Sequence, residues 1–348
     1  MKTVISFPGL GIESLDLNRV LFPLFGGLEV RTYGVFIVLG LVLALLYAVL
    51  RGRGRDQIRA GAVADVWLLS VICGVIGARA FYVMSTWSVV EYETFWDVIA
   101  IRIGELPLYG ALIGGCVGVL IGCLWKRVPV CRMLDIAAPA VLLGQAVGLV
   151  GNLFEGAAHG TVIAEETAAS FFGRTVMLPS GEGTLFHALR MELAEVGTWE
   201  AYHPLFLYEW VWVVLGFVLL SVLSRHKRFH GQIALTYAAW YGFGRMLIEA
   251  FRYDSLYWSD STLRMSQLVG AVSFLFAAIA LTVLLIRNRG RDPYAPTPVP
   301  HADDRTWKNK ENNRFSRSME HVLSRHAKKH RTDVQKQSQE DLKHGKQN

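Results

Sequence analysis

Charged residues are scarce in this sequence of 348 residues. Asp, Glu, Lys and Arg make up 18% of the chain, whereas hydrophobic residues make up 52%, and the mean hydropathy is +0.33. A soluble domain rarely combines so many apolar residues with so little charge. The composition therefore argues against a soluble globular protein and indicates a chain that lies largely in lipid.

The sequence also has few cysteines and no secretory signal peptide at its start. Cys73, Cys116 and Cys123 fall inside apolar runs and Cys131 lies in a basic connection. This pattern excludes a disulfide framework and favours cysteines that act as small packing residues. Residues 1–30 lack a basic start followed by an apolar stretch, so the first membrane anchor is expected near residue 33. We expect no metal and no cofactor.

Seven long, mostly apolar runs are present instead. Each can cross a bilayer core of roughly 30 Å at about 1.5 Å per residue. Buried helices of a soluble protein would need amphipathic faces, which these runs do not have. The sequence predicts an all-α polytopic membrane protein, a bundle of seven transmembrane helices. The runs are 33–50, 62–84, 107–125, 136–154, 204–224, 231–250 and 266–287.

Basic residues gather in every second connection between the runs. The connections 51–59, 126–132 and 224–230 are strongly basic, whereas 85–106 and 155–203 are dominated by acidic residues. Because Lys and Arg favour cytoplasmic loops, this alternation predicts the N-terminus outside and the C-terminus in the cytoplasm.

This pattern divides the chain into three parts. We expect residues 1–30 to form an N-terminal periplasmic segment and 31–287 to form the membrane domain. Residues 288–348 are polar and basic and cannot bury enough apolar surface to fold alone, so we expect a disordered cytoplasmic tail. The tail can be solvated, which we favour, or held against anionic lipid headgroups. The net charge of +6 comes largely from the tail and the basic loops, so we predict no nucleic-acid partner.

Polar residues gather in the half of the bundle that this orientation places near the outer face. Such residues are costly in a membrane and usually face a cavity or a partner. Arg245, Glu249 and Arg252 share one helix face, because their spacing is i, i+4 and i+7. Either Glu249 or a lipid phosphate can balance Arg245, and the charges alone favour neither alternative. The other residues in this half are Tyr33, Arg79, Tyr109, Gly151, Asn152, His203, Tyr208 and Glu209.

Several of these segments resemble the prolipoprotein diacylglyceryl transferases. HPLFLYE (203–209) is similar to the family pattern H-P-[ST]-x-L-Y-E, and YGFGRMLIEAFRYD (241–254) contains G-R-x-x-x-E-x-x-R. Further similar segments are RTYGVFIVLG (31–40), GARAFYVM (77–84), LYGALIGG (108–115), DIAAPAVLLGQAVGLVGNLFEGAAHG (135–160) and MSQLVG (265–270). The resemblance covers roughly residues 25–287 and leaves out the tail.

The resemblance implies a reaction and its partners. Family members move the diacylglyceryl group of phosphatidylglycerol to the lipobox cysteine of prolipoproteins and release glycerol 1-phosphate. It implies a multi-pass protein of the bacterial inner membrane, which we expect to be a monomer. The residues that it implies in catalysis are Arg245, His203, Glu249 and Tyr33. Those that it implies in substrate binding are Arg79, Asn152, Gly151, Tyr208, Glu209 and Tyr109.

Two signature positions depart from the family pattern. Leu149 stands where the family has Arg, and Tyr109 stands where it has His. Leucine cannot contact a phosphate through charge, and tyrosine is a poor base near neutral pH. Three hypotheses therefore stay open. The first is an active transferase in which Arg245 and Arg79 carry the phosphate and His203 or His159 replaces the missing His. The second is a catalytically degenerate paralogue that binds phospholipid or signal peptide without transfer, and the third is a different lipid-linked transferase reaction.

Overall fold

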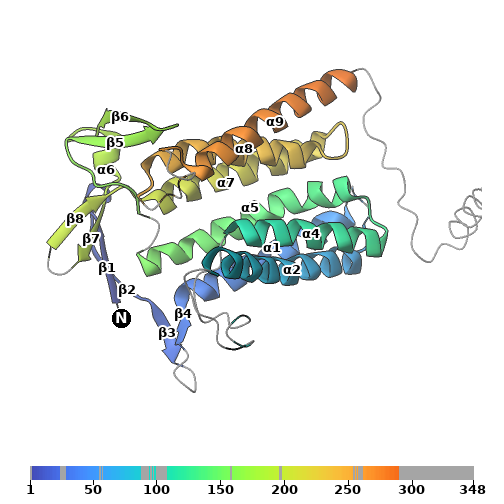
Figure 1. Cartoon of the computed structure of the whole chain (residues 1–348), viewed down its shortest axis with the longest axis horizontal. Coiled ribbons are helices and arrows are strands. Elements are labelled where there is room, and N and C mark those ends of the chain that lie inside the picture. The colour runs from blue at the N-terminus through green and yellow to red at the C-terminus, as the bar shows by residue number, and fades with distance from the viewer. Residues whose placement is uncertain are drawn as a thin grey trace, which may run out of the picture. The chain divides into compact units, whose positions relative to one another are not determined.

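The computed structural model describes residues 2–23, 29–54, 56, 58–87, 94, 96, 98, 108–156, 159–195, 198–253, 255, 257 and 262–289. The predicted tail therefore lies outside the described residues, apart from its first two positions. Long helices dominate the described part (Figure 1). They are α1 (Thr32–Arg53), α2 (Ala60–Thr86), α4 (Leu108–Lys126), α5 (Val130–Glu155), α7 (Leu205–Leu223), α8 (Gln232–Ile248) and α9 (Met265–Arg287).

Six of these helices are long and apolar enough to cross a membrane: α1, α2, α4, α5, α7 and α9. The helical part of the chain thus makes it a multi-pass membrane protein. The remaining long helix, α8, has 17 residues, and the chain continues at its end as a short 3-10 helix, η3 (Glu249–Phe251). The predicted run 231–250, the sixth along the chain, therefore forms a helix that is shorter than the six membrane-spanning candidates.

Glycines bring the long helices close together in pairs. A Cβ atom added at Gly40 would lie 2.5 Å from the main-chain oxygen of Gly144, so α1 and α5 touch through their backbones. The same holds for α2 with α4 and for α8 with α9. Small residues are common at such contacts, because in lipid the packing of helices depends on close approach. The remaining close pairs are Gly77 with Gly110 and Gly242 with Gly270.

Strands form at the end of the helices where residues 1–31 and 160–203 lie, and the all-α prediction is wrong in this respect. A four-stranded antiparallel sheet has the order β2-β1-β7-β8, and two hairpins accompany it, β3-β4 and β5-β6 (Figure 1). A short helix, α6 (Leu185–Ala188), follows β6. The strands are β1 (Lys2–Phe7), β2 (Ile12–Asn18), β3 (Val20–Pro23), β4 (Glu29–Arg31), β5 (Glu166–Phe171), β6 (Arg174–Pro179), β7 (Met191–Glu195) and β8 (Thr198–Tyr202).

The sheet joins the N-terminal segment to the long connection before α7. Ile5 of β1 pairs with Leu15 of β2 and with Leu193 of β7. Ile5 and Leu193 pack with Phe7, Met191 and Phe206 in one buried cluster. Because Phe206 belongs to the first turn of α7, this small core fixes the start of α7 against the sheet.

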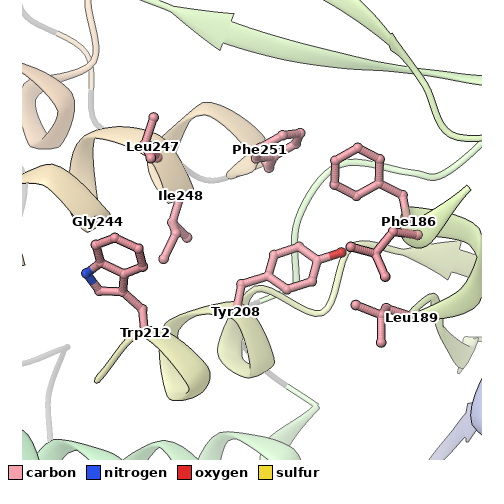
Figure 2. A pocket seen from close by; sticks show the side chains of 9 residues that line it. Phe186, Leu189, Tyr208, Trp212, Gly244, Leu247, Ile248 and Phe251 are labelled. Carbon is pink, nitrogen blue, oxygen red and sulfur yellow. The ribbon is translucent and has the colours of Figure 1, made fainter. Parts of the chain in front are cut away.

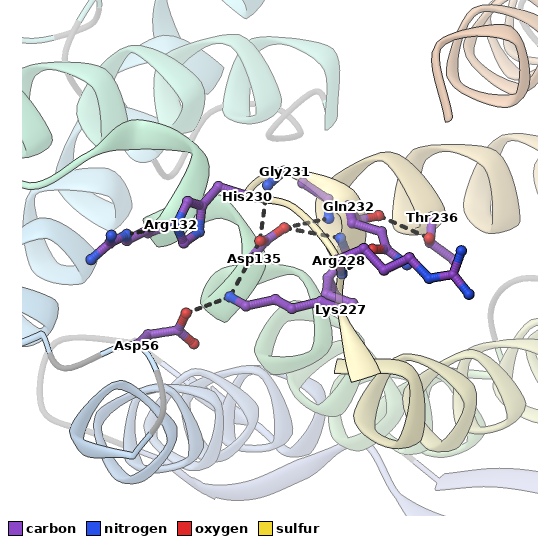
Figure 3. A network of polar contacts seen from close by, with 11 residues as sticks. Asp56, Arg132, Asp135, Lys227, Arg228, His230, Gly231, Gln232 and Thr236 are labelled. Carbon is purple, nitrogen blue, oxygen red and sulfur yellow. Dashed lines mark hydrogen bonds and ion pairs between the residues drawn. The ribbon is translucent and has the colours of Figure 1, made fainter. Parts of the chain in front are cut away.

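A buried charge network fixes the start of α8 (Figure 3). The Asp135 carboxylate, on α5, accepts hydrogen bonds from the backbone N–H groups of Gly231, Ile233 and Ala234 at 2.9, 2.9 and 3.1 Å. These are N–H groups that the first turn of a helix leaves without partners. Lys227 lies 3.4 Å from Asp135 and also contacts Asp56. The network therefore attaches the start of α8 to α5 and to the connection after α1.

Candidate functional site

A largely buried ion cluster joins α7 to the end of α8. Arg245 Nη1 donates a 2.6 Å hydrogen bond to Glu209 Oε1 of α7, and Arg245 Nη2 lies 2.9 Å from Glu249 Oε2, one turn further along. The second contact is an ion pair without hydrogen-bond alignment, since Glu249 Oε2 has no hydrogen-bond partner. Glu249 is 1% exposed. Arg245 is thus balanced by two carboxylates, and the sequence had suggested only one of them.

Residues at the start of α9 contact the end of α8 that carries this cluster. Gln267 is fully buried, and its Nε2 donates to the main-chain oxygens of Ser170 and Met246 at 2.8 and 3.3 Å. Its Oε1 accepts the N–H of Phe172 at 3.0 Å. Gln267 therefore links the β5-β6 hairpin to the last turns of α8. Arg264 Nη1 donates to the main-chain oxygen of Glu249.

The two departures from the family pattern have different surroundings. The Tyr109 hydroxyl, at the start of α4, lies 2.7 Å from Ser266 Oγ of α9. Leu149 packs against an apolar cluster of α5 and α7 that includes Ala146 and Val213. A leucine at this position thus fills space between helices.

His203 and Tyr208 form a separate buried group on the strand side of α7. His203 is fully buried, with Nε2 3.0 Å from Thr167 Oγ1 of β5 and Nδ1 3.2 Å from the Tyr208 hydroxyl. The rings of Phe186 and Phe251 lie 5.1 Å from its ring. Burial lowers the pKa of His203 from its ordinary value to about 4. The ring is therefore neutral at pH 7.

An apolar cavity of about 270 Å³ lies beside this histidine group. Figure 2 shows side chains from α6, α7, α8 and η3 pointing toward it, with the Tyr208 hydroxyl as a polar group at its edge. Such a lining suits hydrocarbon better than a charged group. The lining residues are Leu185, Phe186, Leu189, Tyr208, Trp212, Gly244, Leu247, Ile248 and Phe251.

The remaining predicted site residues lie on α1, α2 and α5. Tyr33 of α1 is 37% exposed and packs on Gly151 of α5, where an added Cβ would lie 3.0 Å from Tyr33 Cδ2. Asn152 follows in the last turn of α5, and its main-chain oxygen accepts the N–H of Gly156. Arg79 of α2 is buried, and its Nε donates to the main-chain oxygen of Val98 at 2.7 Å.

The structure thus brings together Arg245, Glu249 and Glu209, and separately His203 and Tyr208. Sequence reasoning missed Thr167, Arg264 and Gln267. Thr167 lies in a strand that the hydropathy pattern does not reveal, and the other two stand at the start of an apolar run, where a polar residue usually marks the membrane boundary. Among the described residues, no group of three or more His, Cys, Asp or Glu side chains could hold a metal ion.

The fold and the site define a multi-pass membrane protein with a buried guanidinium–carboxylate cluster and an adjoining apolar cavity. The family model described as prolipoprotein diacylglyceryl transferase matches residues 19–283. The chain belongs to this family.

Several relatives carry the name phosphatidylglycerol–prolipoprotein diacylglyceryl transferase. The protein with this name from Lysinibacillus sphaericus (strain C3-41) is 36% identical over 265 residues, which are 75% of this chain and 90% of the relative. The one from Ligilactobacillus salivarius (strain UCC118) is 35% identical, covering 76% and 92% of the two chains. Transferase 1 of Clostridium perfringens (strain 13 / Type A) is 31% identical, covering 78% and 97%.

Proposed function

We propose that this chain transfers the diacylglyceryl group of phosphatidylglycerol to the lipobox cysteine of prolipoproteins. The observation that carries the proposal is the family match over 19–283, which includes every residue of the buried ion cluster. The relatives matched at 31–36% identity are named for this reaction, and none of those named above supports the degenerate-paralogue hypothesis. The proposed partners are phosphatidylglycerol and prolipoprotein signal peptides, and the proposed assembly is a monomer.

The proposed location is the bacterial inner membrane, with the N-terminus outside and α8 as the seventh span. The basic connections 51–59, 126–132 and 224–230 support this orientation, because they alternate with the acidic connections 85–106 and 155–203. The contacts of α8 with α5, α7 and α9 support its place inside the bundle despite its 17 residues. The ion cluster would then lie toward the outer face, where the lipobox cysteine of a secreted preprotein arrives.

The reaction forms a bond between the cysteine sulfur and the glyceryl carbon of the lipid, and breaks the bond from that carbon to the phosphate oxygen. Glycerol 1-phosphate departs with the electron pair, and the thiol proton passes to a base or to water. Positive charge beside the phosphate favours this departure. We place Arg245 beside the departing phosphate, where its guanidinium supplies part of this positive charge, and we assign proton acceptance to His203 or Glu249.

Substrate positioning falls to the residues around these groups. The apolar cavity beside Tyr208 suits hydrocarbon of the substrates. Tyr33, Gly151 and Asn152 support one side of the lipid headgroup in this proposal, and Arg79 and Tyr109 support another. Arg79 is buried in α2, so its part depends on its guanidinium reaching the headgroup.

The proposal is tested by transfer of labelled diacylglyceryl from phosphatidylglycerol to a lipobox peptide. We expect the purified wild-type protein to transfer label from phosphatidylglycerol and not from phosphatidylcholine. We also expect Leu149→Arg to leave activity unchanged or lower it, because Leu149 packs in an apolar cluster. No transfer by the wild-type protein under conditions in which the L. salivarius relative is active would refute the proposal. Transfer only by Leu149→Arg would establish the degenerate-paralogue hypothesis.

A further inference from the structure

Arg264 is a second buried guanidinium beside the Arg245 cluster. It directly precedes α9 and is 7% exposed. Its Nη1 donates to the main-chain oxygen of Glu249, its guanidinium carbon lies 6.0 Å from the centre of the Tyr257 ring, and its Nε is buried without a hydrogen-bond partner. Within the described part of the chain, it forms no ion pair with a carboxylate. A buried cation is costly unless an anion or a further acceptor completes its surroundings.

The charges of the cluster indicate where an anion would be accepted. Arg245 is held by Glu209 and Glu249, so these three side chains carry one positive and two negative charges. A phosphate that approached Arg245 alone would therefore meet a net negative charge. Arg264 contacts the backbone of Glu249 and brings the four side chains to neutrality. Among the described residues, Arg264 is the guanidinium of this group that no carboxylate contacts directly.

The guanidinium edge of Arg264 on the side away from this contact has the donor pattern that a phosphate accepts. Nη1 is engaged with Glu249, which leaves Nε and Nη2 as the edge that can present two parallel N–H groups to an anion. Guanidinium binds phosphate strongly through such an edge, and a charge-assisted hydrogen bond in a dry site is about twice as strong as a neutral one.

We infer that Arg264 binds the phosphate of the lipid substrate. The inference rests on the proposed function and deepens it, because it assigns the phosphate contact to a residue outside the motifs that resemble the family.

A purely structural role for Arg264 makes a different prediction. A cation that donates to the last carbonyl groups of α8 also stabilises the negative end of that helix. Arg264→Gln keeps an N–H donor for Glu249 but removes the charge, whereas Arg264→Met removes both. If Arg264 only caps the helix, R264Q resembles the wild type and R264M is less stable. If Arg264 binds phosphate, both variants lose the preference for an anionic lipid.

The experiment measures thermal unfolding in detergent with added phosphatidylglycerol or phosphatidylcholine, and KM and kcat for transfer. We expect phosphatidylglycerol to stabilise the wild type more than phosphatidylcholine does. R264Q should lose this difference, raise the KM for phosphatidylglycerol by about 10- to 100-fold, and keep the wild-type unfolding temperature in phosphatidylcholine. Arg190→Gln is the matched control, because Arg190 is a half-buried arginine paired with Glu192 in the same outer part of the chain. It should behave as the wild type.

Equal lipid preference in R264Q and the wild type would overturn the inference. An equal loss of lipid preference in R264Q and R190Q would also overturn it, and so would a wild type without lipid preference. If R264Q does not fold, Arg264→Lys replaces it, and an unchanged affinity for phosphatidylglycerol in R264K overturns the inference because an ammonium lacks the fork. A wild type that prefers phosphatidylglycerol but transfers nothing refutes the proposed function alone, and the lipid measurements still decide the role of Arg264.

Discussion

His203 occupies a fully buried position in which both ring nitrogens face hydroxyl groups, those of Thr167 and Tyr208. Its pKa is lowered to about 4 by burial, whereas an unfolded chain has a histidine pKa near 6.5. The folded state therefore binds fewer protons than the unfolded state between these values. The stability that this histidine contributes is fully present above about pH 6.5 and is lost as the pH falls toward 4.

We predict that acidification from pH 7 to 5 lowers the stability of the wild type by up to about 2 kcal/mol through His203. His203→Gln keeps a donor and an acceptor but does not titrate, so it should flatten the fall in unfolding temperature over this range. His159→Gln is the matched control, because the His159 ring packs on Tyr202 outside the cavity. An equally steep pH dependence in H203Q and the wild type would contradict the assignment of the effect to this residue.

At the scale of elements, α7 and α8 are joined by a reciprocal tryptophan pair. Trp212 Nε1 donates to the Trp240 main-chain oxygen at 3.1 Å, Trp240 Nε1 donates to that of Trp212 at 3.0 Å, and the two rings stack at 4.2 Å. Each indole lies over a glycine of the facing helix. A Cβ at Gly244 would lie 2.0 Å from Trp212 Nε1, and one at Gly216 would lie 2.4 Å from Trp240 Nε1.

We predict that Gly244→Ala displaces the Trp212 indole and lowers the free energy of unfolding by about 1–3 kcal/mol, as overpacking does. Because Gly244 neighbours Arg245 and lines the cavity, the same change should also reduce transfer. Gly148→Ala in α5 is the control, since nothing lies within 4 Å of its added Cβ. The measurement is thermal unfolding in detergent. A G244A protein as stable as G148A would show that the indole moves without cost.

The charge network around Asp135 gives a second prediction at this scale. Asp135→Ala removes the acceptor of three backbone N–H groups at the start of α8 and one partner of the buried Lys227. We expect a loss of about 3–5 kcal/mol, because one member of a buried pair is then uncompensated. Asp65→Ala removes the partner of Lys126 in a more exposed pair, with Asp65 44% exposed, and should cost about 0–1 kcal/mol. Similar unfolding temperatures for D135A and D65A would contradict the assigned role.

At the scale of the whole molecule, apolar run length predicted the positions of all seven long helices within a few residues. Charge spacing predicted that Arg245 and Glu249 share a helix face but left open whether Glu249 or a lipid phosphate balances Arg245, and in the structure the two side chains form an ion pair. Glu209 was a candidate, but its contact with Arg245 depends on how α7 packs against α8 and leaves no local pattern in the sequence. The strands were missed because short alternating segments such as β1 vanish in a window wide enough to find membrane helices.

Orientation is the remaining prediction at this scale, and it follows from the basic loops rather than from packing. Exposed cysteines at the two ends of the bundle should react oppositely with a membrane-impermeant maleimide. Cys131, at the start of α5, is exposed beside a basic loop and should react only after the cells are opened. In a chain with the other cysteines replaced, Glu200→Cys on β8 is exposed in the strand-bearing part and should react in intact spheroplasts.

The reagent, the expression level and the exposure of the two sites are matched, so only the side of the membrane differs between them. Labelling of Cys131 in intact spheroplasts, with E200C protected, would reverse the orientation that the Lys and Arg distribution predicts. That result would also place the Arg245 cluster at the cytoplasmic side, where the lipobox cysteine of a translocating preprotein does not emerge. The proposed reaction would then lose its access to substrate even if the cluster binds phosphatidylglycerol, so the labelling pattern tests the proposed function as well as the topology.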